Sequence, residues 1–177
     1  EGHHYYSWMT GVTGETPGDT TTQYLCDKLD CVYFGTMVLG ELRVKQPNQR
    51  GVHARLGFVA HHGFGGGRML GSRVMNRVRF ADNFPLAHLV FMGHDHTKLA
   101  IPGQGLVVDD TSEDGVGVVK RYYIGTGSFL KGYASGRKRG SYIEEKGLPP
   151  AQLGVSIVSV QLEMDGKQPR LDYHVSI

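Results

Sequence analysis

The sequence lacks the features that mark several large classes of protein. It has only two cysteines, Cys26 and Cys31, and their spacing makes neither a CxxC pair nor another metal-binding pattern. We therefore expect reduced thiols in a cytoplasmic protein. No apolar run approaches the about 20 residues that a membrane-spanning helix needs. We expect neither a membrane span nor a secretory signal peptide.

The sequence also lacks a large excess of charge of either sign. The 19 basic and 17 acidic residues leave a formal net charge of +2, too small to indicate nucleic-acid binding by the chain as a whole. The segment "GRKRG" at 136–140 concentrates part of the positive charge. It is either a solvated loop or an arm that contacts phosphates.

Glycine, by contrast, is abundant. The 26 glycines among 177 residues indicate many tight turns and close backbone approaches. This length is typical of one domain, spanning 1–177. The chain starts with "EGHHYYSW" instead of a methionine, so we expect a fragment or a processed chain.

The centre of the sequence predicts a βαβ unit. An apolar strand at 53–60 precedes a Gly-rich loop, and apolar residues recur at helical spacing over 68–84. A short apolar run at 88–93 is typical of a strand buried on both faces. A strand, a helix and a strand in this order predict parallel pairing of the two strands.

The rest of the chain predicts further strands around this unit. A helix is expected over 20–30, and 31–45 predicts a hairpin or two short strands broken at Gly35 and Gly40. After residue 97 the pattern changes to short strands: "KLAIP", "LVVDD", "GVVKRYYIGTG", "VSIVSVQLE" and "RLDYHVSI". The chain is therefore predicted to be an α/β domain with a β-rich second half.

Four histidines follow the two strands of the βαβ unit. His61 and His62 come after the first strand, and His94 and His96 after the second. Because ligands collect at the carboxyl ends of parallel strands, we expect these rings to converge on one edge of the sheet. In extended backbone His94 and His96 would face the same side, with Asp95 facing away from them. The alternative is that they are ordinary surface residues.

The Gly-rich loop "GFGGGR" at 63–68 leads into the predicted helix. Its amide groups and the helix N-terminus would attract an anion such as phosphate. Arg68 either pairs with a phosphate oxygen or is an exposed residue at the helix start.

The remaining acidic residues and histidines are expected to have no role in the site. The acidic loop at 109–114 is expected to be a solvated turn, although it could bind a cation. His53, His88 and His174 are expected to be structural or exposed.

Together these segments resemble the calcineurin-like metallophosphoesterase superfamily, in the branch common in phages and bacterial mobile elements. That family carries Asp-x-His, Gly-Asp, Gly-Asn-His-Asp/Glu, a histidine after a strand, and Gly-His-x-His. The last two blocks stand here as "AHHG" (60–63) and "GHDH" (93–96). The branch also shares "HHGFGGGR" and the stretch "GSFLKGY…SY…EKGLPP" within 127–150. The first two blocks are absent from the sequence.

The resemblance implies a site with two divalent ions, of Mn, Zn, Fe or Co, that share a hydroxide. The second ion would be bound by His61 and His94, with His3 at the position of the family's Asn. His96 would bind the first ion, and His62 is the less favoured ligand of its pair. His4 would be the catalytic histidine, which contacts the phosphoryl oxygen or protonates the leaving group.

The resemblance also implies a fold and a function. The expected fold is a β-sandwich flanked by helices (αββα), here lacking its N-terminal part. The expected activity is metal-dependent hydrolysis of a phosphoester, in particular a phosphodiester. The alternatives are a non-catalytic metal-binding domain and a nucleic-acid-binding domain with a degenerate site, which would use Lys131, Tyr133 and the basic residues at 137–139.

Overall fold

The computed structural model describes residues 21–45, 53–65, 67, 69–110, 112–133, 136, 140–165 and 168–177. The chain divides into two compact units, Glu1–Val38 and Leu39–Ile177. In the first unit the helix α2 (Thr21–Lys28) confirms the helix predicted over 20–30. Cys26 and Cys31 are free thiols, as expected.

The second unit is built on a mixed sheet with the strand order β1-β2-β3-β5-β4. In β2, β3 and β5 the strands run parallel, whereas β4 pairs antiparallel with β5, and the short β6 also pairs with β5. The strands are β1 (Met37–Lys45), β2 (His53–His61), β3 (Leu89–Met92), β4 (Lys98–Val108), β5 (Val116–Ser128) and β6 (Gly154–Val155). The architecture is α/β, as the sequence predicts.

The predicted βαβ unit is present. Helix α3 (Leu70–Ala81) connects β2 to β3, and the two strands pair in parallel from Phe58 opposite Leu89 to His61 opposite Met92. A turn from Asp82 onward ends the helix before Pro85, because proline cannot continue a helix. The two loops at the carboxyl ends of β2 and β3 therefore lie side by side.

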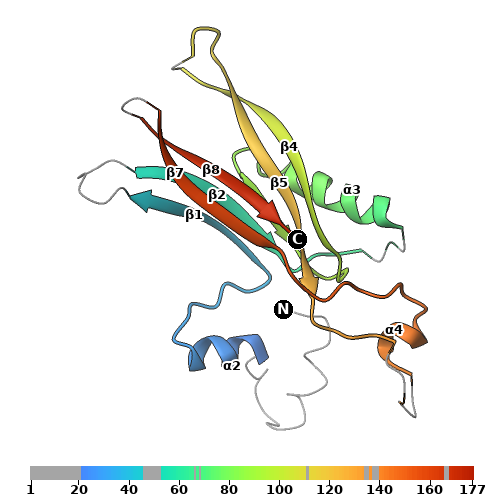
Figure 1. Ribbon diagram of the computed structural model, residues 1–177. Helices are drawn as coiled ribbons and strands as arrows, with labels where there is room; N and C mark the ends of the chain where they lie inside the picture. The colour runs from blue at the N-terminus through green and yellow to red at the C-terminus, as the bar shows by residue number, and fades with distance from the viewer. Residues whose placement is uncertain are drawn as a thin grey trace. The chain divides into compact units, whose positions relative to one another are not determined.

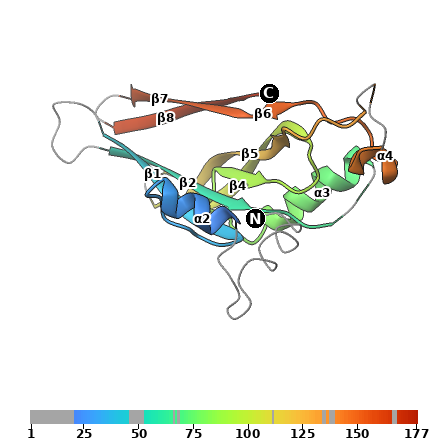
Figure 2. The ribbon, with the colours of Figure 1, turned by 90° about the horizontal axis from the view of Figure 1, so that it is seen from below.

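Each face of the sheet is covered by a different element (Figures 1 and 2). On one face, Leu56, Leu89 and Ile124 pack against Tyr173 and Val175 of the hairpin formed by β7 (Ile157–Asp165) and β8 (Gln168–Ser176). On the other face, Val59, Val90 and Tyr123 pack against Ala81 and Val78 of α3. A short helix, α4 (Tyr142–Glu145), follows β5.

Two predicted breaks in strands are wrong. Within the segment 31–45 the only strand is β1 (Met37–Lys45), and Gly40 lies inside it instead of breaking it. Glycine is needed at this position because a Cβ there would stand only 2.5 Å from the Phe58 ring. The runs "KLAIP" and "LVVDD" form one strand, β4, which passes through Pro102. Proline is tolerated there because β4 is an edge strand, whose outer N–H groups need no partner.

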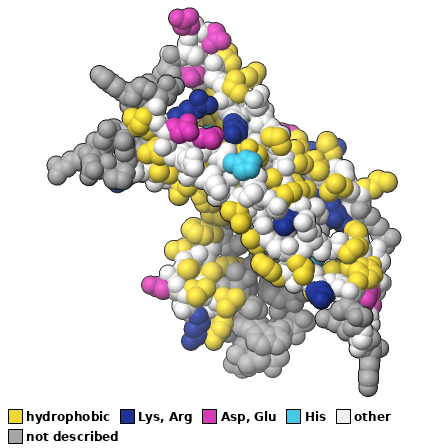
Figure 3. Space-filling view, viewed as in Figure 1, with side chains coloured by type: hydrophobic (Ala, Val, Ile, Leu, Met, Phe, Trp, Pro, Cys, Tyr) yellow, Lys and Arg dark blue, Asp and Glu magenta, His cyan; other side chains and the backbone are white. Residues whose placement is uncertain are grey.

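The acidic segment 109–114 lies at the tip of the β4–β5 hairpin. Asp110, Glu113 and Asp114 are exposed there, and Figure 3 shows acidic side chains at this end of the molecule. Asp114 Oδ1 accepts a hydrogen bond from the Val116 amide, 3.3 Å away. The segment is a solvated turn. Among the described residues, no helix is both long and apolar enough to span a membrane.

Candidate functional site

The candidate site lies where the β2–α3 and β3–β4 loops meet. His61 is the last residue of β2 and pairs with Met92, the last residue of β3. Beyond the strands the Gly93 amide donates to the His61 carbonyl, at 3.3 Å. Parallel pairing thus continues into the two loops and brings residues 61–63 next to residues 93–94, at the edge of the sheet where α/β proteins bind ligands.

Two glycines allow the loops to approach this closely. A Cβ on Gly63, whose φ is +108°, would lie 2.7 Å from the Gly93 carbonyl oxygen and 2.8 Å from His94 Cβ. A Cβ on Gly93 would lie 3.0 Å from the His62 carbonyl oxygen. A larger residue at either position would push the loops apart and separate His62 from His94.

His62 and His94 form a pair across this contact. His62 Nε2 lies 3.2 Å from His94 Nδ1, and the ring centroids are 5.2 Å apart at an interplanar angle of 72°. This distance suits an N–H···N hydrogen bond. It also suits two ligands of one ion, because two bonds of 2.0–2.1 Å in tetrahedral geometry place the nitrogens about 3.3 Å apart. Of the first pair, His62 is the histidine that contacts His94.

His61 has a different environment. Its Nδ1 accepts a hydrogen bond from the Gly63 amide at 2.8 Å, so this nitrogen is unprotonated. The ring packs against Phe80 of α3, with centroids 5.0 Å apart, and against Phe64 at 5.9 Å. Burial lowers the pKa of His61, which favours the neutral ring. Only Nε2 of His61 is left to act as a ligand.

The turn after β3 differs from the extended backbone that the sequence analysis expected. His94 and His96 both have positive φ, 69° and 56°, so the prediction that their rings face the same side of an extended segment is wrong. Histidine is among the residues that tolerate this conformation better than most. Hydrogen bonds within the turn hold it: the Asp95 amide donates to the Gly93 carbonyl, and the Thr97 amide donates to Asp95 Oδ1.

A buried ion pair anchors this turn to α3. Arg77 is fully buried, and its Nη2 lies 2.7 Å from Asp95 Oδ1, whose side chain is 13% exposed. Arg77 Nη1 donates to the Arg73 carbonyl at 2.8 Å. Gly125 of β5 leaves room for the pair, since a Cβ there would lie 3.0 Å from Arg77 Nη2. Asp95 Oδ1 is therefore bound to the Arg77 guanidinium and to the Thr97 amide. It supports the turn that carries His94 and His96.

Sequence reasoning missed Arg77, although a signal was present. The apolar stripe of α3 includes Val74, Val78 and Ala81, and Arg77 falls at the same helical spacing. A charged residue within an apolar stripe is buried only with a partner. Asp95, the acidic residue between the expected ligands His94 and His96, was a possible ion-pair partner for Arg77.

Several predicted site residues cannot be placed. His3, His4, Arg68 and the basic residues 137–139 lie outside the described residues. Within the described part of the chain, no three His, Cys, Asp or Glu side chains are grouped so that they could bind one ion. The structure thus brings together His62 and His94. The wider ligand set of His3, His61, His94 and His96 stays a prediction.

Comparisons with protein-family models, curated proteins and solved structures give no match for this chain. The resemblance to metallophosphoesterases therefore rests on the sequence motifs quoted above.

Proposed function

We propose that this protein is a metal-dependent phosphoesterase that hydrolyses phosphodiesters at the carboxyl edge of β2 and β3. The observation that carries the proposal is the 3.2 Å contact between His62 Nε2 and His94 Nδ1. The two rings come from the "AHHG" and "GHDH" motifs, which lie 32 residues apart in the sequence. Such convergence at adjacent strand ends is typical of a ligand site in an α/β sheet.

The donor chemistry suits a divalent transition metal. Imidazole nitrogens bind Zn, Fe and Co readily, and the spacing of the two nitrogens matches adjacent positions around one ion. An ion needs about four or more ligands, so the proposal requires donors beyond His62 and His94. The resemblance assigns His61 and His3 to the same ion as His94, and it assigns His96 to the other ion of the pair. His61 could contribute through Nε2.

A bound divalent ion would supply a metal-activated hydroxide near neutral pH and would neutralise charge on the phosphoryl oxygens. The residues of the chain orient this chemistry. The Arg77–Asp95 ion pair holds the turn in which His94 and His96 lie. Gly63 and Gly93 keep the two loops in contact. His4 would contact the phosphoryl oxygen or protonate the leaving group, as the resemblance implies.

The test uses metal binding and turnover as separate readouts. We expect the wild-type protein to bind Co²⁺ with visible absorption bands and, loaded with Mn²⁺, to hydrolyse bis(4-nitrophenyl) phosphate. His62→Asn and His94→Asn should each weaken Co²⁺ binding and reduce turnover by about 100-fold or more, because losing an oriented ligand costs several kcal/mol of transition-state stabilisation. The exposed His174 of β8 provides the matched control, His174→Asn, which should change neither.

Unchanged Co²⁺ binding and turnover in His94→Asn would refute the proposal. Co²⁺ binding that depends on His62 and His94, without hydrolysis of any phosphodiester, would instead identify a non-catalytic metal-binding domain. That alternative is favoured by one observation: only two of the candidate ligands contact each other among the described residues.

A further inference from the structure

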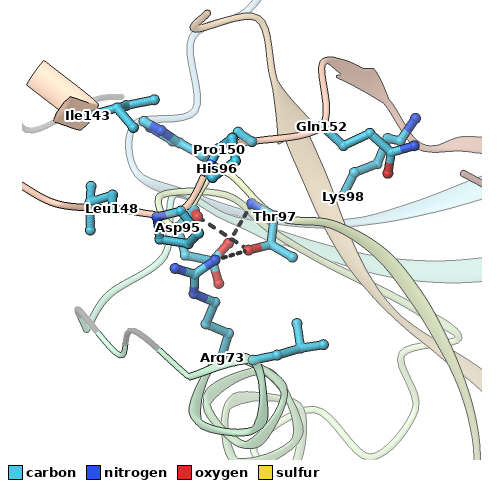
Figure 4. Close-up of a pocket in the computed structure, with 12 residues that line it drawn as sticks. Arg73, Asp95, His96, Thr97, Lys98, Ile143, Leu148, Pro150 and Gln152 are labelled. Carbon is cyan, nitrogen blue, oxygen red and sulfur yellow. Dashed lines mark hydrogen bonds between the residues drawn. The ribbon is translucent and has the colours of Figure 1, made fainter. Parts of the chain in front are cut away.

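A cavity of about 280 Å³ opens beside the β3–β4 turn (Figure 4). It is lined by the first turn of α3, by the turn after β3, by the start of β4 and by the segment 148–152. Asp95 and His96 belong to its lining, so the cavity begins within two residues of His94. The resemblance gives His96 a role as a metal ligand, but it assigns no ligand to the cavity itself.

The charges around this cavity favour an anion. Arg73 and Lys98 line it, and Asp95 is the only acidic side chain among the described residues of the lining. The Asp95 carboxylate is already paired with the buried guanidinium of Arg77. Among the described residues of the lining, Arg73 and Lys98 therefore face no unpaired acidic side chain. A negatively charged group would be attracted to this space.

Arg73 is held in place for such a contact. Its Nε donates to the Gly67 carbonyl at 2.9 Å, and its Nη1 donates to Thr97 Oγ1 at 2.7 Å. Figure 4 shows the guanidinium next to Thr97 at the cavity. Nη2 makes no hydrogen bond to any described residue and lies on the same planar group. A guanidinium fixed through two of its nitrogens can bind a phosphate oxygen with little loss of side-chain entropy.

The opposite wall of the cavity is apolar and rigid. It consists of Leu148, Pro149 and Pro150, with Ile143 of α4 beside them. The Tyr133 hydroxyl donates to the Leu148 carbonyl at 2.7 Å, which fixes the start of this segment. Two consecutive prolines restrict the backbone further. Such a wall is suited to an apolar ring and offers few partners to a second charged group.

We propose that this cavity binds one nucleotide unit of a phosphoester, with its phosphate at Arg73 and its base against the Leu148–Pro150 wall. The combination of a cationic side and an apolar side matches the two halves of a nucleotide. The volume is near the lower end of the range for small-molecule sites, about 300–1,000 Å³, and accommodates a single unit. The inference that this nucleotide is part of a substrate or product rests on the proposed function. The inference that the cavity binds a nucleotide does not depend on it.

The test is calorimetric titration of the metal-free protein, in EDTA, with adenosine 5′-monophosphate. Adenosine and inorganic phosphate serve as the two halves of the ligand. We expect the nucleotide to bind at least tenfold more tightly than either half. Arg73→Gln should weaken nucleotide binding by tenfold or more, and Lys98→Met should weaken it by several-fold. The matched control is Arg79→Gln, because Arg79 is an exposed arginine on the same helix.

Each outcome bears on the proposal. Nucleotide binding that Arg73→Gln and Lys98→Met leave within twofold of wild type would overturn it, as would the absence of binding at millimolar concentration. Inorganic phosphate that binds as tightly as the nucleotide would overturn the role of the apolar wall. If Arg73→Gln unfolds the protein, judged by circular dichroism, Lys98→Met decides alone. Since no metal is present, failure of the phosphoesterase proposal would leave these results unaffected.

Discussion

The strand β3 has a histidine near each end, and the two histidines have different environments. His88 precedes the strand, and its Nδ1 accepts a hydrogen bond from the Gly57 amide of β2 at 3.1 Å. Its ring packs edge-on against Tyr173 of the β7–β8 hairpin, with centroids 6.0 Å apart. His94 follows the strand in a turn with positive φ, and its ring meets His62.

The difference shows how position in a parallel sheet decides the role of a histidine. At the amino end of β3, the imidazole of His88 replaces a backbone acceptor and joins two neighbouring strands. At the carboxyl end, the loops after β2 and β3 project from the sheet together, so their side chains face each other. His88 therefore contributes to stability and His94 to the candidate site. The following predictions test this separation.

The largest expected effect comes from the ion pair beneath the carboxyl-end turn. Asp95→Ala would leave the fully buried Arg77 guanidinium without its carboxylate. Removing one partner of a buried pair costs about 3–5 kcal/mol, because a desolvated charge stays behind. We expect a loss of this size in the free energy of unfolding, measured by urea titration with circular dichroism.

The control for this prediction is an exposed ion pair in the same unit. Glu41 pairs with Arg43 on β1, where the side chains are 36% and 60% exposed. Surface pairs contribute about 0–1 kcal/mol, so Glu41→Ala should change little. If Asp95→Ala were no more destabilising than Glu41→Ala, the proposed anchoring of the turn would be wrong.

A smaller change in stability is expected when either of the histidines that flank β3, His88 or His94, is replaced. His88→Ala would leave the Gly57 amide without an acceptor, which costs about 1–3 kcal/mol of stability. Its Co²⁺ affinity should equal that of wild type. His94→Asn should behave in the opposite way, because asparagine tolerates positive φ but removes the imidazole. Urea titration measures stability and Co²⁺ absorbance measures metal binding, so together they show whether each variant loses only one of the two properties. Parallel losses of both in either variant would contradict the comparison.

The smallest expected effect is a dependence of stability on pH at the amino end. Burial lowers the pKa of His88, and the nearby Arg121 lowers it further. The unfolded chain, with a histidine pKa of about 6.5, then binds a proton more readily than the folded protein. The stabilising contribution of neutral His88 is therefore present above pH about 6.5 and is lost as the pH falls toward the lower folded pKa.

The variant His88→Gln isolates this contribution. Its side-chain oxygen can accept from the Gly57 amide but does not titrate. The free energy of unfolding should decline less steeply between pH 7 and 5 in the variant than in wild type. His61, whose pKa is also lowered by burial, contributes equally to both proteins. Identical slopes would show that His88 is solvated in the folded state.

Much of the fold follows from local sequence pattern. The strands and helix of the βαβ unit were predicted within a few residues, because apolar periodicity and the position of Pro85 are local signals. The errors at Gly40 and Pro102 have a tertiary cause. Gly40 was expected to break a strand but makes room for the Phe58 ring, and Pro102 is accommodated by an edge. The contact of Gly40 with Phe58 and the edge position of β4 both depend on how the strands are arranged in the sheet, which the local sequence does not show.

The site is predictable in part for a similar reason. The meeting of the two strand ends follows from topology, so the convergence of the histidine motifs was expected. Whether His61 or His62 contacts His94 depends on the direction in which each side chain points at the end of β2. The His61 ring packs against Phe80 on α3, whereas the His62 ring packs edge-on against His94. The role of Asp95 depends on Arg77, which lies 18 residues away on another element.

The spacing of 32 residues between His62 and His94 also affects how the protein folds. A contact of this kind requires the closure of a long loop, whose entropy cost is met before the contact contributes. The strands of the β7–β8 hairpin are separated by only two residues in the sequence, so their pairing has no such requirement and can form early. The histidine pair assembles only when β2 and β3 have docked around α3. Pulse-labelling hydrogen exchange at Gly93, which donates to the His61 carbonyl, would therefore report when the two loops come together during folding.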